Sequence, residues 1–174
     1  MKTFLSAFLG LIFLPVFCFA ETTTPPPIDC QYQRAKDTED KEKKLLSTWA
    51  ENAAIQSFQF NAENLKTELN ALKNCYTAQG WKGFNEALKT SGNLEAIKNN
   101  QLTVTSKISG VTQIQNIKEK QWKVSVPLKV TYQNKDKELL QTLDVSLLIA
   151  LNKSGTLGIM QVIAVPEQSE NTKT

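Results

Sequence analysis

Cysteine is the residue type in this sequence whose number and spacing point most directly to chemistry. The chain has three cysteines, at Cys18, Cys30 and Cys75. None of them forms the Cys-x-x-Cys spacing that lowers the pKa of a thiol, so redox catalysis is not indicated. Cys18 lies in an N-terminal segment that we expect to be removed. The remaining pair, Cys30 and Cys75, predicts a disulfide if the chain folds in an oxidising compartment.

Such a disulfide would have a structural role. In the chain-entropy treatment, closing the loop between Cys30 and Cys75 stabilises the protein by about 4 kcal/mol. The bond between Cys30 and Cys75 would tether the N-terminal part of the mature chain to its folded body. The alternative is that Cys30 and Cys75 are two unrelated buried thiols.

Other residues with catalytic potential are few. The sequence contains no histidine, which removes the commonest general base and the commonest zinc ligand. Asp144 alternates with the apolar residues Leu143 and Val145, so we expect its carboxylate to face solvent. Tyr132 falls on the apolar face of its predicted strand and is expected to be a core tyrosine with a hydrogen-bonded hydroxyl. We predict no catalytic residue, no cofactor-binding residue and no metal ligand.

Charge composition argues against a nucleic-acid partner. The chain has 20 Lys+Arg and 17 Asp+Glu, with a formal net charge of +3. Arg34 is the single arginine, and the lysines are dispersed along the chain. Nucleic-acid surfaces need clustered cations, and phosphate sites need a glycine-rich loop after a strand, which we do not find.

The first residues resemble an export signal. Met1 and Lys2 give a small positive start, and the run from Phe4 to Phe17 is almost wholly apolar. At about 14 residues the run is shorter than the roughly 20 that span a hydrocarbon core. We predict cleavage between Ala20 and Glu21 and a periplasmic protein. The alternative is an uncleaved segment that anchors the chain in the inner membrane; otherwise membrane association is at most peripheral or transient.

The remainder divides into three parts. Residues 21–36 form a linker that begins with Glu-Thr-Thr-Thr-Pro-Pro-Pro, a composition typical of an extended spacer. Residues 37–166 form one domain, since a chain of 174 residues with 41% hydrophobic and 21% charged residues has the length and composition of one globular domain plus a short appendage. Residues 167–174 are predicted to be a disordered tail.

The first half of the domain has helical periodicity. A helix is expected to begin near Asp37, and its apolar stripe comprises Leu45, Leu46, Trp49, Ala50, Ala53 and Ala54. We expect Asn61 to cap a second helix and Thr77 a third, which Gly92 ends. Asn93 is expected to cap a short fourth helix.

The second half alternates with period two. Four strands are expected, at residues 102–108, 122–132, 139–151 and 157–165, joined in part by polar hairpin turns at residues 133–136 and 152–155. Pro127 cannot donate to a ladder, so we place it at an edge or a bulge. Helices followed by strands predict an α+β fold, with N-terminal helices packed on a curved four-stranded antiparallel sheet.

Several segments, in this order, resemble the DotI/IcmL family of type IVB secretion and conjugation proteins, which is related to TraM. They are residues 57–65, 76–88, 91–102, 122–132 and 158–163, so the resemblance spans about Leu45 to Val165. Within them, the Gly-Trp-x-x-Phe-x-x-Ala-Leu helix and the Val-Pro-Leu-x-Val-Thr-Tyr strand are the most specific parts together.

The resemblance implies a fold similar to nuclear transport factor two and to the VirB-type periplasmic domain. It also implies a non-enzymatic scaffold without a cofactor, whose partners are other secretion-system subunits or copies of itself. The alternative is a periplasmic protein of the same fold that binds or carries a small ligand outside the secretion machine.

Overall fold

A computed structural model describes residues 39–167 of the chain. The helices are α1 (Glu39–Ser57), α2 (Leu65–Leu72), the 3-10 turn η1 (Lys73–Cys75), α3 (Ala78–Thr90) and α4 (Asn93–Asn99). The strands are β1 (Phe60–Asn61), β2 (Thr103–Ile108), β3 (Gln113–Lys118), β4 (Gln121–Gln133), β5 (Glu138–Leu151) and β6 (Leu157–Pro166). The predicted signal peptide, its cleavage site at Ala20 and Glu21, the linker and all but the first residue of the predicted tail lie outside the described residues.

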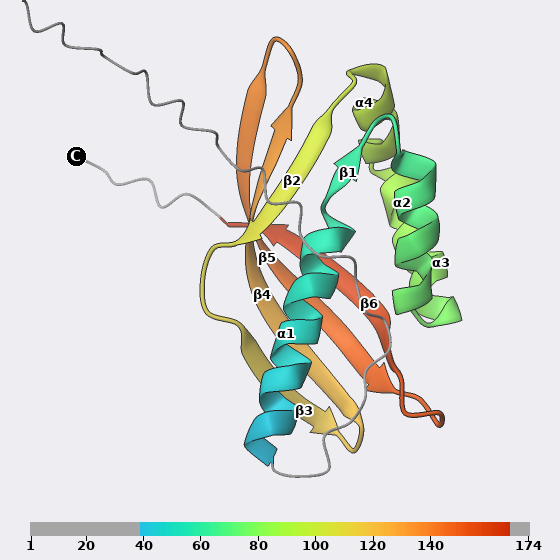
Figure 1. Cartoon of the computed structure of the whole chain (residues 1–174), viewed down its shortest axis with the longest axis vertical. Coiled ribbons are helices and arrows are strands. Elements are labelled where there is room, and N and C mark those ends of the chain that lie inside the picture. The colour runs from blue at the N-terminus through green and yellow to red at the C-terminus, as the bar shows by residue number, and fades with distance from the viewer. Residues whose placement is uncertain (1–38, 168–174) are drawn as a thin grey trace, which may run out of the picture.

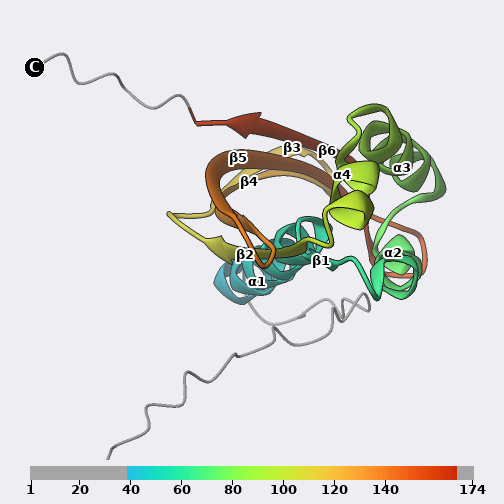
Figure 2. The ribbon, with the colours of Figure 1, turned by 90° about the horizontal axis from the view of Figure 1, so that it is seen from above.

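The strands form one antiparallel sheet in the order β1-β2-β4-β5-β6, with β3 paired to β4. Helix α1 lies along the sheet, while α2, α3 and α4 form a separate group beside it (Figure 1). Seen from above, β4 and β5 curve so that α1 lies on their concave side (Figure 2). The α+β prediction is therefore confirmed, but within residues 39–167 the sheet has six strands rather than four.

The two strands missing from the prediction bury little regular surface. Strand β3 has one half-buried residue, Ile114, between exposed neighbours, so its sequence shows no alternation. Strand β1 is only two residues long, with Phe60 buried. Period-two patterns arise when one face of a strand is covered, and neither strand meets this condition along its length.

Helix α1 contributes one buried stripe to the core. Leu46, Trp49, Ala50, Ala53, Ala54 and Ser57 follow the spacing of three and four residues and are buried. Leu45, predicted to belong to this stripe, is 43% exposed. It precedes Leu46 by one position, and the helical rotation of about 100° per residue carries it off the buried face.

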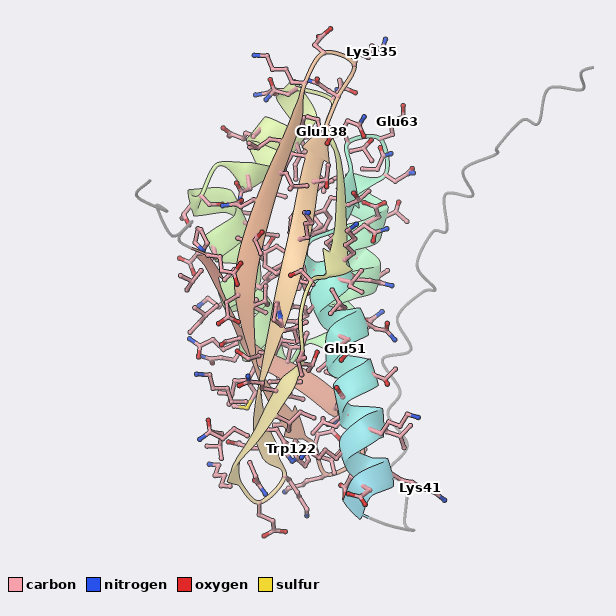
Figure 3. The ribbon with its side chains drawn as sticks, turned by 90° about the vertical axis from the view of Figure 1, so that its left-hand side faces the viewer. Lys41, Glu51, Glu63, Trp122, Lys135 and Glu138 are labelled. Carbon is pink, nitrogen blue, oxygen red and sulfur yellow. The ribbon has the colours of Figure 1, made fainter. Side chains whose placement is uncertain are left out.

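The central strands supply the opposite side of the core. Alternate residues of β4 and β5 are inaccessible to solvent: Val124, Val126, Leu128, Val130, Val145, Leu147 and Ile149. This burial does not extend to the tip of the β4-β5 hairpin, where Leu139 is 64% exposed. Lys135 marks this tip, which extends beyond the helices (Figure 3).

Pro127 lies in a central strand, not at an edge or bulge as predicted. It is opposite Asp144 of β5, and on its other side β4 changes partner, from β3 up to Ser125 to β2 from Leu128 onward. In this gap the Pro127 carbonyl accepts a hydrogen bond from the Ser109 N–H at 2.9 Å. The missing N–H of proline is tolerated because no strand pairs with β4 at that point.

The predicted helix N-cap is correct at Thr77 and wrong at Asn61 and Asn93. Thr77 is the N-cap of α3 and its hydroxyl accepts from the Gly80 N–H at 3.0 Å, as predicted. Asn61 does not cap α2; its side chain accepts from the Glu63 N–H in the turn before the helix, at 2.9 Å. Asn93 is the first residue of α4 rather than its cap, a position held by Gly92 with φ of 72°.

One close contact fixes the α2–α4 group to the sheet. The Thr77 N–H donates to the Ile159 carbonyl at 2.9 Å, and Tyr76 forms a parallel bridge with Ile159. The first turn of α3 thus lies on the edge of β6. A Cβ added to Gly80 would come within 2.1 Å of the Ile159 carbonyl oxygen, so only glycine allows this approach.

We therefore expect Gly80→Ala to lower the free energy of unfolding by about 1–3 kcal/mol, because α3 must move off β6. Gly83 is in the same helix, and a Cβ there meets nothing within 4 Å. Gly83→Ala should stabilise the protein by up to about 1 kcal/mol through helix propensity. Urea denaturation of both variants tests the contact. Equal effects of the two substitutions would show that α3 does not approach β6 this closely.

Candidate functional site

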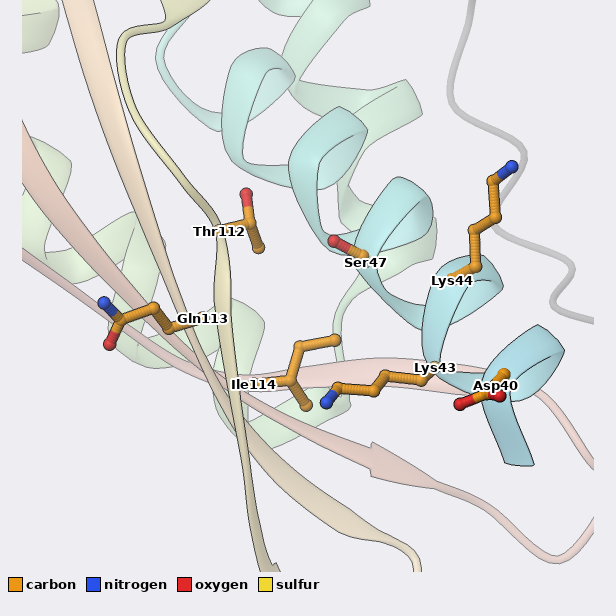
Figure 4. Close-up of a pocket in the computed structure, with 7 residues that line it drawn as sticks. All are labelled: Asp40, Lys43, Lys44, Ser47, Thr112, Gln113 and Ile114. Atoms are coloured by element: carbon orange, nitrogen blue, oxygen red, sulfur yellow. The ribbon is translucent and has the colours of Figure 1, made fainter.

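One hollow among the described residues is a groove between the start of α1 and strand β3. We call it the α1–β3 groove; its volume is about 540 Å³ and it is lined by Asp40, Lys43, Lys44, Ser47, Thr112, Gln113 and Ile114. The α1 residues follow at spacings of three and four, so they share one helix face. In Figure 4 the Lys43 side chain reaches across toward Ile114, whereas Lys44 points away from the strand. A second hollow of about 340 Å³ adjoins it through Lys43 and Ile114.

The lining of the α1–β3 groove carries charges of both signs. Its charged lining is one carboxylate, Asp40, and two lysines. General acid-base chemistry needs titratable groups with separated pKa values, and nucleophilic catalysis needs a base beside the nucleophile. The described lining provides neither arrangement. The buried Thr112 hydroxyl has no hydrogen-bond partner among the described residues.

A third hollow lies between α2, α3 and α4. We call it the three-helix groove; its volume is about 360 Å³ and it is lined by Leu65, Lys66, Leu69, Asn70, Lys73, Trp81, Asn85, Leu94 and Lys98. Leu69, Trp81 and Leu94 are half-buried and form an apolar floor. The exposed side chains of Lys66, Lys73 and Lys98 contribute three positive charges, and no carboxylate is among the described lining residues.

Sequence reasoning missed this groove because its residues come from three separate helices. Each helix shows only an ordinary amphipathic pattern, and the spacing of Trp81, Phe84 and Leu88 does not distinguish a core stripe from the wall of a groove. Phe84 is indeed buried, whereas Trp81 lies partly in the groove. The lysines on α2 and α4 could have been found only by knowing how the helices pack.

Among the described side chains, Tyr76, directly before α3, has the pKa that departs most from its usual value. Its hydroxyl lies 2.8 Å from the buried Ser57 hydroxyl, and Ser57 Oγ donates to the Ala53 carbonyl at 2.7 Å. The Ser57 proton is thereby used, so the Tyr76 O–H donates to Ser57. Burial raises the pKa of Tyr76 well above its usual range, and the bond to Ser57 lowers it by less. Tyr76 also stacks on Phe84 with ring centroids 5.0 Å apart.

The Ser57–Tyr76 pair ties the end of α1 to the α2–α4 group. It is a structural link, because neither hydroxyl is exposed to a substrate. Ser57 is a polar residue on the apolar stripe of α1, but its partner Tyr76 is distant in the chain. The sequence alone therefore does not reveal the pair. Tyr132, the tyrosine singled out from the sequence, is half-buried, and burial raises the pKa of its phenol.

The remaining predicted residues are found in different places. The Asp144 carboxylate is exposed on the outer face of the sheet, as predicted, and accepts from the Ser125 hydroxyl at 3.1 Å. Cys75 is fully buried in η1. Cys30 lies outside the described residues, so the predicted disulfide stays a prediction.

Two further properties concern metals and membranes. Within residues 39–167, potential metal-binding side chains do not gather in groups of three. No helix in the same range has the length and apolar character of a membrane span.

The buried phenol of Tyr76 predicts a pH dependence of stability. Its neutral form is favoured in the folded state, so its contribution is complete below the unfolded pKa of 10.0 and is lost as pH rises above it. Tyr76→Phe should make this alkaline fall in unfolding free energy shallower. At pH 7 it should cost about 1 kcal/mol through loss of the hydrogen bond.

Denaturation at a series of pH values measures both effects, with Ser57→Ala as the control, because that variant keeps the buried phenol and hence the alkaline fall. An unchanged pH profile in Tyr76→Phe would contradict the account of this pair.

Comparison with solved structures supports the fold. An IcmL-like type IV secretion system protein from Legionella pneumophila matches with a TM-score of 0.70 and 21% identity, over 73% of this chain and 94% of that one. The periplasmic domain of DotI matches with a TM-score of 0.68 and 28% identity, over 78% and 99%. VirB8 of Agrobacterium tumefaciens matches with a TM-score of 0.58 and 7% identity, over 79% and 100%.

No curated protein shows significant similarity to this sequence. Residues 19–166, however, match the DotI/IcmL family, described as an inner-membrane complex component of the type IVb secretion system. The resemblance inferred from the sequence is therefore confirmed. The chain belongs to the DotI/IcmL family of type IVB secretion system components.

Proposed function

We propose that this protein is a non-enzymatic binding component of a type IVB secretion-like machine that acts in the periplasm. The family match over residues 19–166 is the observation that carries the proposal. The absence of any acid-base or nucleophile-base arrangement in the described grooves supports a scaffold. The small-ligand alternative gains no support, because the hollows lie between surface elements and Ser57 is the buried polar residue of the described core.

The three-helix groove is the surface we assign to partner subunits. Its apolar floor of Leu69, Trp81 and Leu94 suits the apolar face of an amphipathic helix. Lys66, Lys73 and Lys98 would face carboxylates on the flanks of that helix. Because the lining residues of the groove include no acid, an acidic segment meets no like charge there.

A co-purification experiment tests this function. The exported protein is cross-linked in cells that carry the secretion machine, and captured proteins are identified by mass spectrometry. We expect secretion-system subunits, and at least a tenfold lower yield with Lys66→Glu, Lys73→Glu and Lys98→Glu combined. The control combines Lys118→Glu, Lys135→Glu and Lys153→Glu, which make the same change in net charge at exposed sites elsewhere. Equal yields from both variants, or no secretion subunit from the unaltered protein, would contradict the proposal.

The periplasmic location rests on the N-terminal signal. The DotI domain similar to this chain is a periplasmic domain. An oxidising periplasm would allow the Cys30–Cys75 bond. Because Cys75 joins α2 to α3 through η1, the bond would hold the segment before α1 against the α2–α4 group.

The processing and the disulfide are tested together on protein from a periplasmic extract. Intact mass should correspond to a chain that begins at Glu21. After unfolding, Cys30 and Cys75 should react with an alkylating reagent only when a reductant is present. Cys30→Ala should lower the free energy of unfolding by about 2–4 kcal/mol. An unprocessed chain in which both Cys30 and Cys75 react without a reductant would refute both predictions.

A further inference from the structure

The C-terminal half of strand β6, from Gln161 to Pro166, is an open sheet edge among the described residues. The contact with Tyr76 and Thr77 covers β6 at Ile159, but from Gln161 to Pro166 every residue except Val162 is exposed. Ile163 is 50% exposed and Val165 55% exposed. β6 from Leu157 to Pro166 contains no charged residue. Native edge strands are usually protected by charge, a bulge at the exposed part or a covering element, and this part has none of these among the described residues.

The register of β6 shows which backbone groups point outward. The Glu167 N–H donates to the Thr142 carbonyl at 3.0 Å, directly after the pair Pro166–Leu143. In an antiparallel ladder alternate residues bond to the neighbouring strand, so Val165 and Ile163 bond to β5. Val162 and Ala164 therefore direct both N–H and C=O away from the sheet. The described residues supply no partner for these groups.

The free edge fits a second copy of the same strand. It is limited at one end by α3, which packs over Ile159, and at the other by Pro166, which has no N–H. A partner strand must therefore be about as short as this edge itself. Two copies related by a two-fold axis at Ile163 would exchange bonds between Val162 of one and Ala164 of the other. Because β6 is uncharged, this pairing places no like charges opposite each other within the two strands.

We propose that two copies of this protein associate by antiparallel pairing of residues 161–165 of β6, with Ile163 opposite Ile163 of the other copy. The pairing joins the two sheets into one continuous sheet and covers the exposed side chains of Ile163 and Val165. The contact area is small, so the association is weak in dilute solution and grows with local concentration. The inference goes beyond the proposed function, because it holds whether or not the protein binds secretion subunits.

Cysteine cross-linking of the exported full chain tests the register. Residues opposite each other in a non-hydrogen-bonded antiparallel pair, as Ile163 and its counterpart would be, have Cα atoms about 4.5 Å apart, which is within disulfide range. Ile163→Cys should therefore form disulfide-linked dimers under mild oxidation. Val165→Cys is the matched control, since it is on the same face and equally exposed. Its copies would be displaced by four residues, about 13 Å along the strand. We expect at least ten times more dimer from Ile163→Cys.

A second variant removes the pairing without altering the cross-linking position. Ala164→Pro deletes an N–H that points away from β5, so the ladder within the chain keeps its bonds. In the Ile163→Cys background it should reduce dimer formation to the level of the Val165→Cys control, while circular dichroism stays native. Equal cross-linking at the two cysteine positions would overturn the proposal, even if Ala164→Pro fails to fold. So would dimer formation that persists in folded Ala164→Pro.

Discussion

The contact between the first turn of α3 and the edge of β6 determines how the helices are arranged on the sheet. It consists of the hydrogen bond from the Thr77 N–H to the Ile159 carbonyl, and it requires glycine at position 80. Through it the α2–α4 group is placed beside the sheet instead of over it. The three-helix groove forms within that group, and the concave face of the sheet remains available for α1. The same contact covers one half of β6 and leaves the other half open.

Helix α1 completes the core from the opposite side. Its narrow stripe of Trp49 and small alanines allows a close approach to the curved strands β4 and β5. The polar end of this stripe, Ser57, is stabilised by the Tyr76 hydroxyl, which comes from the chain segment that leads into α3. Helix α1 and the α2–α4 group are thus linked by a buried hydrogen bond. Among the described residues the core is apolar apart from Ser57, and the hollows lie at the surface.

The sequence predicted the elements that are buried on one face. Leu46 to Ala54 and the alternating residues of β4 and β5 have a periodicity that follows directly from burial. Thr77 was identified because N-capping is a local interaction. Strand β3 was missed because Ile114 alone is half-buried between exposed neighbours, so no alternation appears. The exposure of Leu139 shows that alternation does not reveal where the covering layer ends. The resemblance to the DotI/IcmL family could be identified from the order of short segments.

The site was less predictable than the fold. The lysines of the three-helix groove, the Ser57–Tyr76 pair and the open edge at Val162 and Ala164 all depend on residues brought together from distant parts of the chain. Hydrogen exchange of the β6 amides in dilute, monomeric protein is the most direct test of this arrangement. The account predicts slow exchange at Thr77, Ile163 and Val165 and fast exchange at Val162 and Ala164. Equal protection of all five amides would show that the β6 edge is covered within the single chain, contradicting the account.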